Sequence, residues 1–174
     1  LVDEHHVREL DPDMMFIDQR AIHFDPVDIR GVPSVENGKA VWAPPDFLPT
    51  GGKGLLFFDE LNAAPQLTQA AIYQLVIPPH RLGEYQLPEG WSVGAAGNRE
   101  TDRAVVHRMP SALANRLLHL EFEVDLEEWV AWALTNGIET EVIAFIRFRP
   151  GLLHQFDPSR DDKAFPTPVS IPRR

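Results

Sequence analysis

Cysteine is absent from the 174-residue sequence, which excludes disulfide bonds and thiol catalysis and fits a reducing cytosol. No apolar run approaches the length of a transmembrane helix and no signal peptide is visible, so we expect a cytoplasmic protein without membrane contact. Positive charge is scarce: 16 Lys and Arg face 26 Asp and Glu, giving a formal charge of -10. Because no basic stripe offsets this charge, we expect no nucleic-acid partner.

The sequence also lacks an initiator methionine, since it begins at Leu1. We therefore expect the chain to be a fragment or a processed product. Its 44% hydrophobic and 24% charged residues are ordinary for a globular protein. The length is enough for one domain with a core, with or without a small appendage.

Four short apolar runs predict strands that are buried on both faces of a sheet. They occupy residues 14–17, 55–58, 91–96 and 117–124. Polar residues end the first three runs, namely Asp18, Asp59 and Asn98. Open α/β sheets bind ligands at the carboxyl ends of their strands, so polar residues there are candidates for a site.

A helix is predicted between the second and third strands, at residues 65–76, with Pro65 at its first position. Its expected apolar face consists of Leu67, Ala71, Tyr73 and Leu75. Strand, helix and strand at this spacing are typical of a βαβ unit and therefore of a parallel sheet. The predicted fold class is α/β.

A β-hairpin is predicted at residues 31–44, inserted between the first two strands. Asn37-Gly38 is a preferred pair for a type I′ turn, and Val35 and Val41 flank it. The hairpin interrupts the α/β pattern, and its turn is polar. We therefore expect it to contact a partner rather than to stabilise the core.

Two helices are predicted in a C-terminal region, residues 125–174, which follows an α/β core at residues 1–124. The first helix has Asp125 as its N-cap and Gly137 just past its end. The second lies near residues 139–147 and stops before Pro150. Residues 156–174 are proline-rich and charged, which predicts irregular structure.

Asp59 and Glu60 form the first candidate site. A hydrophobic strand that ends in Asp-Glu is what a Walker B element requires: the Asp coordinates Mg²⁺, usually through water, and the Glu polarises the attacking water. The alternative is that two solvated acids simply end a core strand. Sequence alone leaves both interpretations open.

Asn98 and Arg116 extend this candidate site. A neutral amide at the end of a neighbouring strand can orient a water against a γ-phosphate without adding negative charge. An arginine before the fourth strand can reach a neighbouring subunit and stabilise charge on the transferring phosphoryl group. The alternatives are that Asn98 opens a loop and that Arg116 is an ordinary surface residue.

Taken in order, a series of segments resembles the AAA+ ATPases, specifically their MoxR-like branch. The matching segments are DPVDIRGVP, VWAPPDFLP, GLLFFDELNAAP, QAAIYQLV, RLGEYQLPEGW, AAGNRETD and MPSALANRLLHLE. They lie within residues 14–125, and weaker similarity continues through AFIRFRP to FPTP. The resemblance implies a P-loop NTPase-type parallel sheet with flanking helices.

The resemblance also implies roles for the candidate residues. Asp59 and Glu60 correspond to Walker B, Asn98 to sensor 1, and Arg116 to an arginine finger that acts on the adjacent subunit. The hairpin corresponds to an insert that projects toward the pore of a ring. For the intact parent, the resemblance implies ATP hydrolysis with Mg²⁺ in a hexameric ring that remodels or activates a client protein. Related proteins often act with a von Willebrand A-domain partner.

The sequence departs from this family in two places. It contains no G-x-x-x-x-G-K-[ST] phosphate loop; Gly52-Lys53 in TGGKG lacks the required neighbours and predicts a turn. We expect the loop to lie upstream of Leu1, so nucleotide affinity should be poor and the sheet should have unpaired edges. At the other end, Val169 follows FPTP where the family usually has its sensor 2 arginine.

The missing loop also favours a second interpretation from a different class. The chain could be a non-hydrolysing interaction module, a split or degenerate homologue that binds a partner through its hairpin and sheet edges. A phosphate loop in frame upstream of Leu1 would support the ATPase. A true start codon there would support the module.

Overall fold

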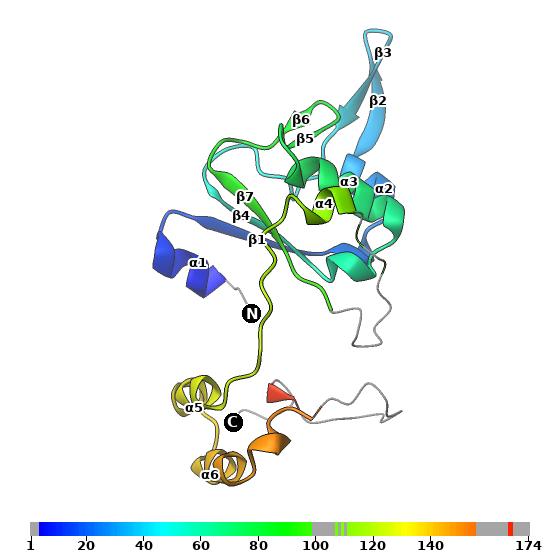
Figure 1. The fold of residues 1–174 in the computed structure, drawn as a ribbon. Helices are drawn as coiled ribbons and strands as arrows, with labels where there is room; N and C mark the ends of the chain where they lie inside the picture. The colour runs from blue at the N-terminus through cyan, green and yellow to red at the C-terminus, as the bar shows by residue number, and fades with distance from the viewer. Residues whose placement is uncertain (1–3, 99–106, 108, 110, 156–166, 169–174) are drawn as a thin grey trace. The chain divides into compact units, whose positions relative to one another are not determined.

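The computed structural model describes residues 4–98, 107, 109, 111–155 and 167–168, which Figure 1 shows as coloured ribbon. The chain divides into two compact units, Leu1–Leu118 and His119–Arg174. The described elements of the first unit are α1 (Glu4–Leu10), β1 (Met15–Arg20), the 3₁₀ turn η1 (Ala21–His23), α2 (Pro26–Arg30), β2 (Val32–Glu36), β3 (Lys39–Ala43), β4 (Gly54–Asp59), the 3₁₀ turn η2 (Leu61–Ala63), α3 (Gln66–Val76), β5 (Arg81–Leu82), β6 (Tyr85–Gln86), β7 (Trp91–Ala95) and α4 (Ser111–Ala114).

The main sheet has three parallel strands in the order β1-β4-β7, which confirms the predicted α/β class (Figure 1). The central strand β4 is the apolar run that the sequence places before Asp59. Leu56 and Phe58 on this strand are fully buried, as a strand with neighbours on both sides requires. The β7 strand begins at Trp91 and pairs with β4 along its whole length.

The first strand is longer than predicted, because β1 runs to Arg20. Asp18 therefore lies inside the strand, opposite Phe57, and is not at its carboxyl end. The expectation that Asp18 ends the strand was wrong. Among the described strands β1 is at an edge of the sheet, and Asp18 is exposed there. An edge strand tolerates polar side chains that a central strand excludes, so a polar residue did not mark its end.

Residues 117–124 form no strand, although their apolar pattern predicted one. Leu118, Leu120 and Phe122 are 86%, 68% and 80% exposed. Within the part of the chain that the structure describes, no strand pairs with this segment. A strand needs a partner for its backbone hydrogen bonds, and an apolar pattern alone does not supply one.

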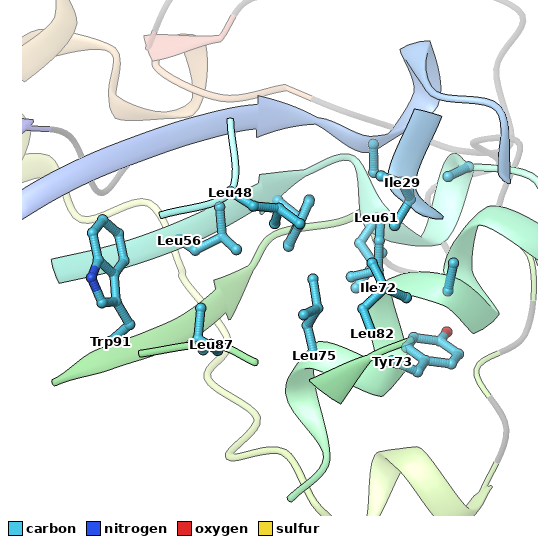
Figure 2. Close-up of a cluster of buried hydrophobic side chains, with 14 residues drawn as sticks. Ile29, Leu48, Leu56, Leu61, Ile72, Tyr73, Leu75, Leu82, Leu87 and Trp91 are labelled. Carbon is cyan, nitrogen blue, oxygen red and sulfur yellow. The ribbon is translucent and has the colours of Figure 1, made fainter. Parts of the chain in front are cut away.

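The helix α3 confirms the predicted βαβ unit, but its buried face differs from the prediction. The buried positions Thr68, Ala71, Ile72 and Leu75 follow the i, i+3, i+4, i+7 spacing of an amphipathic helix. Leu67, which was expected on this face, is 70% exposed. Figure 2 shows Ile72 and Leu75 together with Leu56 in the core of the first unit.

The predicted hairpin is present as the antiparallel pair of β2 and β3, which projects from the first unit in Figure 1. Glu36 pairs with Lys39, and the two residues between them have positive φ angles, 52° at Asn37 and 74° at Gly38. Positive φ at both central residues defines the type I′ turn. The Asn-Gly prediction is therefore confirmed.

The second unit contains α5 (Leu126–Thr135), α6 (Thr140–Phe148) and the 3₁₀ turn η4 (Pro150–Leu152). Asp125 is the predicted N-cap of α5, and its Oδ1 accepts a 2.8 Å hydrogen bond from the N–H of Glu128. Gly137 follows the helix with a φ of 75°. The predicted irregular tail lies outside the described residues except for Thr167 and Pro168. None of the described helices is long and apolar enough to cross a membrane.

Candidate functional site

The chain turns sharply where β4 ends. Glu60 follows Asp59 in the left-handed conformation, with φ 54° and ψ 32°, which is uncommon for a residue other than glycine. Its N–H donates to Oδ1 of Asp59 at 2.9 Å, and its carbonyl accepts from the N–H of Ala63 at 3.0 Å. The turn leaves both acidic side chains half-buried at the carboxyl edge of the sheet. Backbone conformations of this kind occur preferentially at functional sites.

The carboxyl ends of β4 and β7 are joined by backbone hydrogen bonds beyond the strands themselves. The N–H of Ala96 donates to the carbonyl of Phe58 at 3.0 Å, and the N–H of Leu61 donates to the carbonyl of Ala96 at 2.9 Å. These bonds hold the Glu60 turn against the segment that leads to Asn98. The two predicted site elements are therefore neighbours at one edge of the sheet.

Asn98 is exposed, and its carbonyl accepts a hydrogen bond from Nδ2 of Asn62 at 2.5 Å. Because Asn62 lies two residues after Glu60, this bond connects the loop after β4 with the segment after β7. The structure thus brings Asp59, Glu60 and Asn98 to the same region. Sequence reasoning did not select Asn62, because its contact with Asn98 spans 36 residues and no local pattern marks it.

Arg116 lies on a different element from these three residues. It is exposed on the turn after α4, and the adjacent Leu117 packs against the core of the first unit. The structure contains one chain, so a contact from Arg116 to another subunit stays a prediction.

Arg20 is a further polar residue at this edge that the sequence reasoning missed. It is the last residue of β1, and its Cα is paired with that of Asp59 in the parallel register. Residues paired across adjacent strands have their side chains on the same face of the sheet. Arg20 was missed because the predicted strand ended before it.

A buried polar side chain on α3 donates a hydrogen bond to the main chain of the loop after β4. Gln69 is 2% exposed, and its Nε2 donates to the carbonyl of Ala64 at 2.8 Å. Its Oε1 accepts a 2.6 Å hydrogen bond from the hydroxyl of Tyr73, and burial raises the pKa of that hydroxyl. These fully used hydrogen-bonding groups fix the loop on the helix.

The TGGKG segment, for which a turn was predicted, bends at Gly51 and Gly52 and lies at the other end of β4. Lys53 precedes the first residue of the strand, whereas Asp59 is its last residue. The Nζ of Lys53 pairs with Oδ2 of Asp11 at 2.5 Å. This hydrogen bond raises the pKa of Lys53 and lowers the pKa of Asp11. Lys53 is thus placed away from the candidate site.

No group of three or more His, Asp or Glu side chains that could hold a metal ion occurs in the described part of the chain. A nucleotide-bound Mg²⁺ ion uses one or two protein carboxylates together with phosphate oxygens and water. The carboxylate of Asp59 fits such a role.

Neither a protein-family profile nor a curated protein matches this sequence. Among solved structures, the chain is similar to a protein from Cytophaga hutchinsonii that is described as a "putative ATPase". The identity is 17% and the TM-score 0.42, over 90% of this chain and 42% of the other. This chain therefore spans less than half the length of that protein, and a similarity this low supports no conclusion about activity.

Proposed function

We propose that this chain is part of a MoxR-like AAA+ ATPase and supplies the Walker B and sensor 1 half of its site. The observation that supports this most is the left-handed Glu60 turn at the carboxyl end of β4, linked through Asn62 to Asn98. A mere polar end to a core strand needs neither the unusual backbone conformation nor the link. The ordered sequence motifs around the same residues agree with the proposal.

The proposed reaction is the in-line attack of water on the γ-phosphate of ATP. The carboxylate of Asp59 helps to hold Mg²⁺, and that of Glu60 polarises the attacking water. The amide of Asn98 orients this water without adding negative charge. Bound Mg²⁺ supplies positive charge that offsets the charge on the β- and γ-phosphates.

The reaction also requires a phosphate loop, which the 174 residues do not contain. The isolated chain should therefore neither hydrolyse ATP nor bind it tightly, because its sequence lacks the motif whose backbone amides cradle phosphates. Titration of a fluorescent ATP analogue with Mg²⁺ tests this expectation. Micromolar affinity of the isolated chain would contradict it.

The proposal itself is tested with the loop-containing form, by which we mean a polypeptide that carries the required phosphate loop upstream of residue 1. The coding sequence upstream of Leu1 should contain that loop in frame. The loop-containing form should hydrolyse ATP and assemble into a ring, for which we propose six subunits. A start codon directly at this position, or an inactive loop-containing form, would contradict the proposal.

In the assembled ring we propose that the β2–β3 hairpin contacts a client protein, with or without a von Willebrand A-domain partner. The exposed apolar side chains Val32, Val35 and Trp42 on the hairpin support a contact surface. The same surface supports the second candidate function, a non-hydrolysing interaction module. An ATP hydrolysis assay of the loop-containing form distinguishes the ATPase from the interaction module, since only the ATPase should hydrolyse ATP.

Replacing Glu36–Lys39 with Thr-Asp-Gly-Thr, another type I′ sequence, should leave the stability of the loop-containing form nearly unchanged. Surface changes of this kind alter the free energy of unfolding by about 0.5 kcal/mol or less. Client remodelling should decrease. The melting temperature from circular dichroism checks the first expectation, and a large decrease would show that the hairpin is structural instead.

A further inference from the structure

We infer that Asn62 is a positioning residue that fixes Asn98 relative to the Asp59–Glu60 turn; this inference rests on the proposed function. Asn62 belongs to η2, which begins directly after Glu60. Asn62 is therefore close in sequence to Glu60, which we propose polarises the attacking water. It is also hydrogen-bonded to Asn98, which we propose orients that water. Through these two links, Asn62 connects the Glu60 turn to Asn98.

Asn62 engages both ends of the chain segment that separates Asn98 from His107. Its side-chain Nδ2 donates to the carbonyl of Asn98 at 2.5 Å. Its main-chain carbonyl accepts from the N–H of His107 at 2.7 Å. Asn62 thus contacts both Asn98 and His107, and its side chain makes the first of these contacts.

The amide of Asn62 is held in one orientation by its surroundings. Its Oδ1 is buried and has no hydrogen-bond partner among the described residues. A Cβ added to Gly97 would lie 2.2 Å from Oδ1, so only glycine leaves room for the amide at this point. An unpartnered buried oxygen is unfavourable, so the hydrogen bond from Nδ2 to Asn98 is the polar contact that favours this orientation of the amide.

The main chain of residues 62–64 is also held in place, by hydrogen bonds from α3. The buried Gln69 donates from Nε2 to the carbonyl of Ala64 at 2.8 Å and, at 3.4 Å, to the carbonyl of Asn62. Gln69 is itself held by the hydroxyl of Tyr73. A side chain with a rigid support can transmit a defined position to the group it contacts.

The test compares Asn62→Ala and Asn62→Asp in the loop-containing form. Alanine removes the donor, and aspartate keeps the volume but places a carboxylate oxygen against the carbonyl of Asn98. We expect kcat to fall by about 10²-fold, the cost of a misplacement of about 1 Å, while the KM for ATP changes little. Gly97→Ala should have the same effect because it displaces the amide.

Asn136→Ala is the matched control. Asn136 also donates from Nδ2 to a main-chain carbonyl, that of Trp132 at 2.9 Å, but it belongs to the second unit and not to the candidate site. This variant should keep wild-type kcat. Unchanged kcat in both Asn62 variants, with an active wild type, would overturn the inference. If Asn62→Ala fails to fold, kcat of the isosteric variant Asn62→Asp decides whether the inference holds.

A nuclear magnetic resonance readout keeps this inference separable from the proposed function. Asn62→Ala removes the Nδ2 donor, so the ¹³C chemical shift of the Asn98 carbonyl should change, whereas Asn136→Ala should leave that shift unchanged. A wild-type protein without ATP turnover would refute the proposed function, and this shift would then decide alone whether the side chain of Asn62 holds Asn98. An unchanged shift in Asn62→Ala would show that it does not.

Discussion

Replacing Glu60 with Gln in the loop-containing form is expected to lower ATP turnover by about 10²- to 10⁴-fold, the usual contribution of a group that assists proton transfer. The amide preserves the shape of the side chain but removes the negative charge that polarises water. ATP binding should persist, because the proposed Mg²⁺ contact comes from Asp59. Turnover assays and titration with a fluorescent ATP analogue measure the two effects separately.

The matched control for this variant is Glu84→Gln. Glu84 is an exposed glutamate between β5 and β6 and has no role in the proposed site, so the same chemical change should leave turnover unaltered. Undiminished turnover in Glu60→Gln would refute the catalytic role of Glu60. Loss of ATP binding together with turnover would instead assign Glu60 to the binding of nucleotide or metal.

The central elements of the fold could be predicted because local pattern and tertiary environment agree there. The apolar run before Asp59 forms the central strand, and Phe57 is buried on one face of the sheet while Leu56 and Phe58 are buried on the other, so polar residues do not alternate with apolar ones. The Asn37-Gly38 turn and the Asp125 cap depend on a few neighbouring residues, and local chemistry decides both. These are the features that a single sequence encodes most directly.

The features that were missed depend on partners distant in sequence. Residues 117–124 have an apolar pattern, yet none of the described strands pairs with them. Leu67 on α3 was expected to be buried and is exposed, whereas Gln69 is buried because its side chain bonds to Tyr73 and Ala64. Burial of a polar side chain is favourable only when such partners exist, and their positions are set by the fold.

The candidate site was predictable in part for the same reason. Asp59 and Glu60 follow a recognisable strand, so their place at its carboxyl end could be inferred. The left-handed conformation of Glu60 could not, because glutamate carries no preference for it. The role of Asn62 depends on a contact across 36 residues, from η2 to Asn98. No local pattern in the sequence encodes that contact.

Arg116→Ala in the loop-containing form should reduce ATP turnover strongly and change ATP affinity little. An arginine finger contributes roughly 10³- to 10⁵-fold to the rate in GTPases, so even a weaker effect is measurable. Arg116→Lys should not restore the rate, since the planar guanidinium binds two phosphate oxygens at once and an ammonium does not. Full activity of Arg116→Ala would refute this role.

The assignment of Arg116 to the neighbouring site is tested by mixing subunits. Arg116→Ala subunits keep Glu60, and Glu60→Gln subunits keep Arg116, so a mixed ring contains some interfaces that pair both intact residues. At equal amounts and random order, about a quarter of the interfaces in a head-to-tail ring are complete, and a corresponding fraction of turnover should return. As a control, subunits with both substitutions mixed with Glu60→Gln subunits should recover nothing. If the first mixture also recovers nothing while mixed rings form, Arg116 does not act on the adjacent subunit.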